Sequence, residues 1–166
     1  MDYDHLDSPL GRLLLVADEQ GLRCIDFPGA EQDSRIQPGW RRGRRLLERA
    51  IAQLQGYFAG ERQAFDLALA ADGTPFRHKV WDELGRIPYA ETISYGELAR
   101  RIHQPSASRA VGLANGANPI PIIVPCHRVI GSDGRLTGYS GGLSIKQWLL
   151  AHERRHAPVP ALELGA

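Results

Sequence analysis

Apolar and polar positions follow one period at the start of the chain and another from about residue 44 onward. Near the start, an apolar run over Leu13–Ala17 and an alternating stretch over Leu22–Phe27 are bounded by turn residues, which predicts a small antiparallel sheet. Prolines and glycines predict a loop over residues 28–40. Residues 64–70 alternate again and are a further strand candidate.

In later segments the apolar positions recur every three or four residues, which is the period of amphipathic helices. One such stripe occupies residues 47–58. A second helix is predicted over Phe76–Arg86, with Thr74 as its N-cap, and a last one over Ser144–Glu153.

Two short helices are predicted between these longer ones. Ser94 and Glu97 have the spacing of a capping box for a helix that ends near Ile102, and Ser106 is the predicted N-cap of a helix over Ala107–Ala114. Two short helices across a tight turn are typical of a helix-turn-helix, but other helical hairpins share this pattern. The motif alone therefore leaves DNA binding open.

Charge is divided unevenly along the chain. Residues 1–75 carry nine Lys/Arg and twelve Asp/Glu, a net charge of −3, whereas residues 76–155 carry eleven and six, a net charge of +5. With Glu163 in the tail, the whole chain has a net charge of +1. A polyanionic partner would therefore meet the second part. The basic run over residues 41–45 could be a phosphate patch, but it lies in the acidic part, which favours a solvated start of the next helix.

The composition, with 43% hydrophobic and 23% charged residues, is that of an ordinary globular protein. Cys24 and Cys126 are far apart, which excludes a Cys-x-x-Cys motif and a zinc ribbon. The acidic start is unlike a signal peptide, and no apolar run approaches the roughly 18 residues of a membrane span. We therefore expect a cytoplasmic protein with two free thiols and no contact with a membrane.

The most unusual segment is Asn118–Gly131, which is almost entirely apolar and has three prolines within seven residues. The prolines exclude a helix or a central strand, so we expect a buried, extended backbone. A nearby base or positive charge would make Cys126 a nucleophile, and His127 and Arg128 are the candidates. Adjacent residues of an extended segment point to opposite sides, so a water would have to bridge Cys126 and His127. A buried, inert cysteine is the simpler interpretation of this segment alone.

Two later features change the picture. Gly138–Leu143 is a glycine-rich loop with two hydroxyl groups. Glu153, at the end of the last predicted helix, could hold His127 in one tautomer and complete a Cys-His-Glu series.

Together these segments resemble the methylated-DNA–protein-cysteine methyltransferases, also called O6-alkylguanine-DNA alkyltransferases. The resemblance covers the chain from about Phe76 to Glu153 and matches the residues before Phe76 only in outline. The motifs that carry it are Pro125-Cys126-His127-Arg128-Val129, Asn118-Pro119, Ser94-Tyr95-Gly96-Glu97-Leu98-Ala99, Ser108-Arg109-Ala110-Val111-Gly112 and Gly138-Tyr139-Ser140-Gly141-Gly142-Leu143.

The resemblance implies a role for each of five residues in the chemistry. Cys126 would attack the alkyl carbon on guanine O6 and keep the group as a thioether. His127 would take the thiol proton through a water, and Glu153 would orient His127. Asn118 would stabilise the active-site turn, and Tyr95 would donate a proton to the purine.

The same resemblance implies that the target nucleotide is flipped out of the duplex and that Arg109 fills the vacated place. Binding would use the minor groove without strong sequence specificity. The further DNA contacts that it implies are Ser94, Ala107, Ser108, Ala110, Gly112, Arg128 and Ser132. The pocket for the alkylated base would be lined by Tyr95, Val129, Tyr139 and Ser140.

For the fold, the resemblance implies a mixed α/β (α+β) architecture. Residues 1–75 would form a small antiparallel sheet with a helix, of the ribonuclease H-like type, and residues 76–155 a mainly helical, winged helix-turn-helix-like domain that binds DNA and transfers the alkyl group. Residues 156–166 would be a tail. We expect a monomer that acts once on double-stranded DNA containing O6-alkylguanine, and on O4-alkylthymine, without a cofactor. Cys24 lacks His or Cys partners in the sequence, so we predict no structural zinc.

Two other classes of protein explain part of the sequence. A helix-turn-helix regulator would account for the basic part and the short helices, but not for a buried Pro-Cys-His-Arg run. A thiol hydrolase would account for Cys126, His127 and Glu153, but not for Arg109 or the division of charge.

Overall fold

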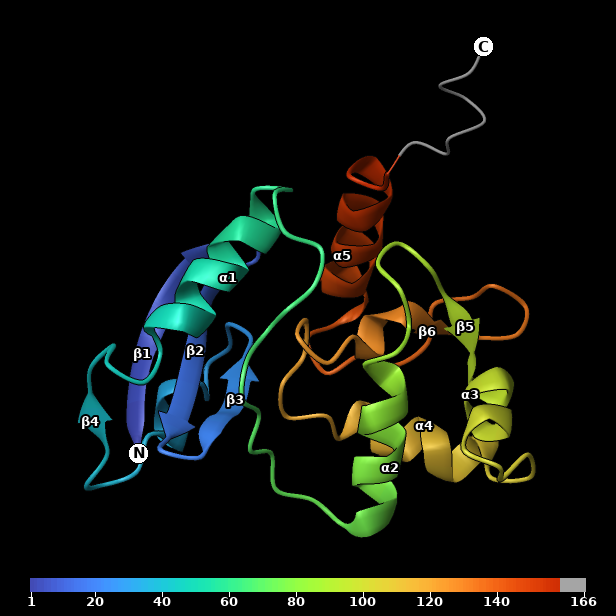
Figure 1. Cartoon of the computed structure of the whole chain (residues 1–166), viewed down its shortest axis with the longest axis horizontal. Coiled ribbons are helices and arrows are strands. Elements are labelled where there is room, and N and C mark those ends of the chain that lie inside the picture. Colours follow the sequence, from blue (N-terminus) through green and yellow to red (C-terminus); the bar gives the residue numbers. More distant parts are fainter. Residues whose placement is uncertain (159–166) are drawn as a thin grey trace.

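The first part of the chain forms a twisted sheet with a helix packed on one face. In the computed structural model, which describes residues 1–158, the strands are β1 (Asp2–Ser8), β2 (Gly11–Asp18), β3 (Gly21–Asp26) and β4 (Arg41–Arg42), and their order is β3-β2-β1-β4. Helix α1 (Glu48–Phe58) lies across this sheet (Figure 1). The predicted antiparallel sheet is confirmed, with β1 and β2 paired from Asp2↔Ala17 to Ser8↔Gly11.

The second part is mainly helical. Its helices are α2 (Pro75–Leu84), α3 (Tyr95–Arg101), α4 (Ser108–Gly116) and α5 (Leu143–Arg155), and its strands are the short parallel pair β5 (Ile93–Ser94) and β6 (Val129–Ile130). Single 3-10 turns occur at η1 (Asp33–Arg35) and η2 (Cys126–Arg128). The mixed α/β architecture is as predicted, and none of the helices in residues 1–158 is both long and apolar enough to cross a membrane.

The two predicted helix caps at Thr74 and Ser94 are confirmed. Thr74 Oγ1 accepts a hydrogen bond from the backbone N–H of Arg77 at 3.2 Å, and Ser94 Oγ accepts one from Glu97 at 3.0 Å. Ser106 is not a cap, because α4 begins two residues later and Ala107, at its N-cap position, makes no side-chain hydrogen bond. The Glu97 carboxylate bonds to arginines one turn further along α3, so the second half of the capping box does not form.

Residues 64–70 do not form a strand. A single bridge joins Leu22 to Leu69, with backbone hydrogen bonds from Leu22 N to Ala68 O and from Ala70 N to Leu22 O. This segment therefore lies along β3 without pairing further, and it runs between the first part of the chain and the second (Figure 1).

The basic run at residues 41–45 is engaged within the sheet, and part of it forms β4. Arg41 pairs with Asp2, Arg44 with Asp4 and Arg45 with Glu19. The predicted helix start is wrong in position, because α1 begins at Glu48. These pairs leave the run little free charge for a phosphate.

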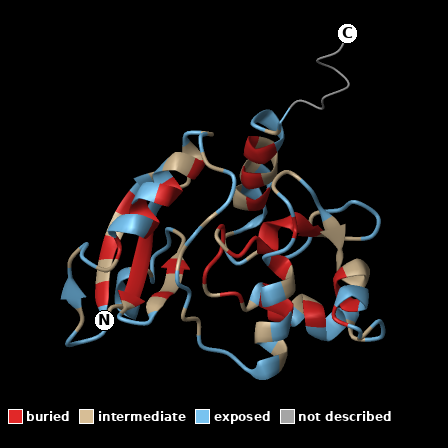
Figure 2. Cartoon of the chain, in the orientation of Figure 1, coloured by how far each residue is buried: buried red, intermediate tan, exposed pale blue. Residues whose placement is uncertain are grey.

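One continuous apolar core connects the two parts (Figure 2). Leu13 and Leu15 contribute from the sheet, Leu54 from α1, Leu84 from α2 and Leu149 from α5, and all five are fully buried. The predicted boundary between residues 75 and 76 therefore separates two regions of the chain that share a core. Of the predicted tail from residue 156, residues 159–166 lie outside the described residues.

Candidate active site

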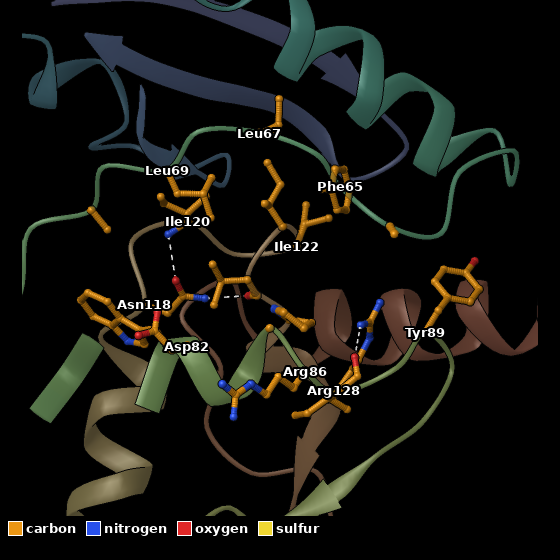
Figure 3. Close-up of a pocket in the computed structure, with 18 of the residues that line it drawn as sticks. Phe65, Leu67, Leu69, Asp82, Arg86, Tyr89, Asn118, Ile120, Ile122 and Arg128 are labelled. Carbon is orange, nitrogen blue, oxygen red and sulfur yellow. Dashed lines mark hydrogen bonds between the residues drawn. The ribbon is translucent and has the colours of Figure 1, made fainter. Parts of the chain in front are cut away.

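The segment before Cys126 is a tight turn stabilised by the side chain of Asn118. Asn118 Nδ2 donates to the carbonyl of Val124 at 2.8 Å, and its Oδ1 accepts from the N–H of Ile120 at 3.0 Å (Figure 3). Both bonds are buried, so they satisfy backbone groups that have no strand or helix partner. Ile122, at φ +73°, occupies a conformation that β-branched residues avoid, which identifies the turn as strained.

A cavity of about 490 Å³ lies behind this turn. Phe65, Leu67 and Leu69 line it from the segment that follows α1, and Ile120 and Ile122 line it from the turn (Figure 3). The first part of the chain thus forms one wall of the space behind the active-site turn.

The extended backbone predicted at Cys126 is wrong, because Cys126–Arg128 form a 3-10 turn. The preceding prolines exclude a regular helix, but a single turn of three residues after Pro125 needs no donor from them. The three side chains are buried, as predicted. A 3-10 turn spreads them about its axis, so Cys126 and His127 point in different directions.

The Cys126 thiol is neutral in the resting protein. Burial raises its pKa, and the polar groups of Asn118 and Tyr139 and the charge of Lys146 act in the opposite direction without cancelling the rise. Such a thiol needs a base to become a nucleophile.

His127 and Glu153 form a buried pair that can supply this base. Nε2 of His127 lies 2.6 Å from Glu153 Oε2, and both side chains are fully buried. Nδ1 of His127 is also buried and has no hydrogen-bond partner among residues 1–158. Burial lowers the pKa of His127 despite the adjacent carboxylate, so the ring is neutral and one nitrogen is free to accept a proton.

Glu153 is the centre of a larger hydrogen-bond network. Arg128 donates from Nε to Oε1 at 2.8 Å and from Nη2 to Oε2 at 3.1 Å. Burial alone would raise the pKa of Glu153, but the bonds from His127 and Arg128 outweigh it and hold the pKa well below its usual range. The carboxylate is therefore charged while His127 is neutral.

Sequence reasoning missed three buried polar residues of this site. Tyr57 Oη donates to Glu153 Oε2 at 2.7 Å, Lys146 Nζ donates to the carbonyls of Val129 and Thr137, and Asn115 Nδ2 donates to the carbonyl of Cys126 at 3.4 Å. One of them had a signal in the sequence. Lys146 precedes Leu149 and Glu153 by three and seven residues, which places a charged residue on the buried face of its helix.

Two of the four residues predicted to line the base pocket, Tyr95 and Tyr139, line a shallow depression of about 650 Å³ on the surface. It is lined by Tyr95, Ser108, Arg109, Gly112, Gly116, Thr137, Gly138 and Tyr139. Thr137 Oγ1 donates to Tyr95 Oη at 3.2 Å, which connects the start of α3 to the glycine-rich loop. The structure thus brings Tyr95, Tyr139 and Arg109 together.

Other predicted residues lie around this depression or away from it. Ala107 is half-buried and Ala110 is exposed near the start of α4, Ser94 caps α3, and Ser132 is exposed after β6. Ser140 lines a separate hollow with Asp26 and Arg35. Val129 is fully buried, and its backbone carbonyl accepts a hydrogen bond from Lys146 Nζ.

Arg128 is only 6% exposed, so the prediction of a DNA contact needs correction. Its guanidinium is occupied by Glu153 and by the carbonyl of Ile87, which accepts from Nη1 at 2.7 Å. We assign Arg128 to the support of Glu153, because its guanidinium is buried and already hydrogen-bonded within the protein.

Both parts of the chain match known families. Residues 1–71 match the 6-O-methylguanine DNA methyltransferase, ribonuclease-like domain, and residues 75–155 match the 6-O-methylguanine DNA methyltransferase, DNA binding domain.

Similar proteins extend over nearly the whole chain. A methylated-DNA–protein-cysteine methyltransferase of Methanosarcina acetivorans is 50% identical over 153 residues, which are 92% of this chain and 98% of the relative. One from Mycolicibacterium paratuberculosis is 51% identical over 161 residues, 95% of each chain. The crystal structure of Mycobacterium tuberculosis OGT in complex with DNA is 47% identical, covers 96% of both chains and has a TM-score of 0.86.

Proposed function

The chain belongs to the 6-O-methylguanine DNA methyltransferase family, and we propose that Cys126 is the residue that receives the alkyl group. The protein repairs DNA by direct reversal, in which an alkyl group moves from O6 of guanine to a cysteine of the protein itself. The observation that carries the choice of Cys126 is the buried His127–Glu153 pair beside it. Cys24, on β3, has no such base, and burial raises its pKa to about 12.

The proton of Cys126 leaves through His127. A water between the thiol and Nδ1 of His127 would satisfy that nitrogen and pass the proton to it, while Glu153 stabilises the imidazolium that forms. The thiolate attacks the alkyl carbon, a C–S bond forms, and the C–O6 bond breaks with its electron pair on the guanine. Tyr95, on the wall of the depression, donates a proton to the purine ring.

The product limits each molecule to one reaction. To remove the alkyl group from the thioether, water or a thiol would have to expel the cysteine thiolate. A thiolate is a poor leaving group, so this displacement does not occur under mild conditions. Cys24 lies on β3, and burial raises its pKa to about 12, so it is not the thiolate that would be needed to release the group. The protein is therefore consumed as a reagent and needs no cofactor.

We propose that DNA binds at α4, with the alkylated nucleotide flipped into the depression at a cost of a few kcal/mol. Arg109 is exposed at the edge of this depression and would fill the vacated place in the stack. Ala107, Ser108, Ala110 and Gly112 are small enough for α4 to approach a minor groove closely, without strong sequence specificity. The net charge of +5 over residues 76–155 supports this surface as the one that meets phosphates.

Every group in this proposal comes from one chain, so we propose that the protein acts as a monomer. We also propose that residues 76–155 form the DNA-binding and alkyl-transfer domain and that residues 1–75 form a second domain, which shares its core and lies behind the active-site turn. A reducing cytoplasm would keep Cys126 as the thiol that the reaction requires.

The test is to incubate the protein with duplex DNA containing O6-methylguanine and to measure its intact mass. We expect one added methyl group, located on a peptide that contains Cys126, in the wild type and in Cys24→Ala but not in Cys126→Ala. An unmodified mass with DNA still bound would contradict the proposal and favour a regulator. Turnover of an ester or peptide would favour a hydrolase.

A further inference from the structure

Tyr57 connects the first part of the chain to the catalytic carboxylate. It lies near the end of α1, is fully buried, and donates from its hydroxyl to Glu153 Oε2 at 2.7 Å. The same oxygen lies 2.6 Å from Nε2 of His127. One carboxylate oxygen therefore accepts from a residue 96 positions away and from the proposed base.

The position of Tyr57 is determined from several sides. Its ring packs against Phe58, Phe65, Tyr89 and His152, with ring centroids 5.2–6.2 Å apart. Its own backbone carbonyl lies 2.8 Å from Nε2 of His152, on α5 one residue before Glu153. The hydroxyl is thus held at the carboxylate, and only the donating direction is available to it, because a charged carboxylate has no hydrogen to give.

Packing alone does not require this hydroxyl. Tyr89 is adjacent, and its ring is 6.2 Å from that of Tyr57, but the Tyr89 hydroxyl has no hydrogen-bond partner among the described residues. The two tyrosines are therefore neighbours, and only the hydroxyl of Tyr57 bonds to Glu153. The charge of Glu153, together with burial, raises the pKa of Tyr57, so the phenol stays protonated and remains a donor.

We propose that Tyr57 is a positioning residue for the alkyl transfer, through which the first part of the chain tunes His127. This rests on the proposed role of Cys126 and His127. The phenol fixes the plane of the Glu153 carboxylate and competes with His127 for Oε2. A competing donor reduces the negative charge that the imidazolium can use, so it limits how strongly Glu153 holds a proton on His127.

The removal of the hydroxyl has two separable consequences. The carboxylate loses one of its fixed donors and is held less tightly, although Arg128 and the N–H of Ala90 still donate to it, and this slows proton transfer from Cys126. The remaining pair with His127 becomes stronger, so the imidazolium is stabilised and the acid limb of the pH–rate profile moves to higher pH. A purely structural tyrosine could slow the reaction but would not move the acid limb.

The experiment is the single-turnover rate of methyl transfer as a function of pH, measured with duplex DNA and with free O6-methylguanine base. For Tyr57→Phe we expect about a tenfold loss of rate on both substrates, the size of a lost hydrogen bond to a charged group, and an acid limb at higher pH. Tyr89→Phe is the matched control and should leave rate and profile unchanged. 3,5-Difluorotyrosine at position 57 donates more strongly, and it should move the acid limb to lower pH while keeping the ring and its packing.

The outcomes separate the two proposals. A wild-type protein that takes up no methyl group would contradict the function itself. Methyl uptake by the wild type with an unchanged rate and profile in Tyr57→Phe would overturn the role of Tyr57. A slower rate with an unmoved acid limb, in both position-57 variants, would do the same and would assign Tyr57 to packing alone. A melting curve of each variant confirms that the folded protein is compared.

Discussion

Arg128 and Glu153 form a bidentate pair inside the protein. Arg128 lies two residues after the proposed nucleophile, Cys126, and Glu153 lies near the end of α5. The two bonds, at 2.8 and 3.1 Å, use both carboxylate oxygens, and the side chains are 7% and 0% exposed. A buried pair of this kind offsets its own desolvation only while both partners are present. Glu153 is thereby held in place for His127.

The loss of Arg128 should therefore be costly. Arg128→Met keeps much of the side-chain volume but leaves Glu153 without its cation, and we expect the free energy of unfolding to fall by about 3–5 kcal/mol. Arg86→Met is the control, because the Arg86–Glu83 pair is on the surface and should contribute less than about 1 kcal/mol. Urea unfolding of both variants measures the difference. Similar small losses would show that Glu153 does not depend on Arg128.

Acid should unfold the protein through three buried groups. The pKa values of His127 and His152 are lowered, mainly by burial, and that of Glu153 is lowered by its hydrogen bonds. Each group is deprotonated in the folded protein while the unfolded chain binds a proton, so stability is complete above the unfolded pKa and is lost as pH falls below it. That pKa is about 6.5 for histidine and about 4.3 for glutamate. Asp26, whose pKa is raised by burial, acts in the opposite direction.

We therefore expect a melting temperature that is level between pH 7 and 8, falls from about pH 6.5 and falls further near pH 4. His152→Gln keeps a donor for the carbonyl of Tyr57 and should reduce the slope between pH 6.5 and 5. His103→Gln, at an exposed position on the α3–α4 turn, is the control. A melting temperature that rises on acidification would contradict the lowered pKa values.

Local sequence patterns predicted most of the helices and strands. Contacts between side chains far apart in the sequence determined the arrangement of the site. The periods of apolar residues and the caps at Thr74 and Ser94 act within a few residues, so they can be recognised in the sequence. The strand at 64–70 was wrongly predicted, because alternation shows which face is apolar but not whether a neighbouring strand is available. The Glu153–His127 pair was predicted from the position of Glu153 at the end of the last predicted helix and from the family resemblance, not from a local spacing.

The role of Tyr57 could not be predicted in the same way. Leu54 and Phe58 define the apolar face of α1, and in the sequence Tyr57 is indistinguishable from another packing residue of that face. Its hydroxyl acquires a partner only when α5 packs against α1, 96 residues along the chain. The same holds for Arg128, for which the family resemblance implied a DNA contact and whose partners in space are Glu153 and Ile87.

Arg109 should matter only when a base has to leave a duplex. Arg109→Ala should slow methyl transfer from duplex DNA because nothing fills the vacated place in the stack, and the cost of unstacking is a few kcal/mol. Transfer from free O6-methylguanine base should be close to the wild type. Arg49→Ala, an exposed arginine on α1 outside the proposed interface, is the control. Equal slowing on both substrates would exclude a role of Arg109 in base flipping.

Gly112 should show a conflict between stability and repair. It lies within α4, where glycine costs up to about 1 kcal/mol relative to alanine. An added Cβ would lie 3.8 Å from Cδ1 of the Tyr95 ring, an ordinary contact, so Gly112→Ala should fold and gain stability. The new methyl group would occupy the wall of the depression beside Tyr95, and transfer from both duplex and free base should be slower.

A larger side chain at this position should block the base altogether, so Gly112→Leu is expected to fold and to take up almost no methyl group. Gly96→Ala provides the matched case on α3. Its Cβ would meet only Arg100 and Ser94, at 3.6 and 3.8 Å, and Gly96 is not among the residues that line the depression. Gly96→Ala should gain stability for the same reason as Gly112→Ala, because alanine favours a helix more than glycine does. It should keep the wild-type rate of methyl transfer, because position 96 does not line the depression. Normal methyl uptake by folded Gly112→Leu would mean that the alkylated base reaches Cys126 by another route.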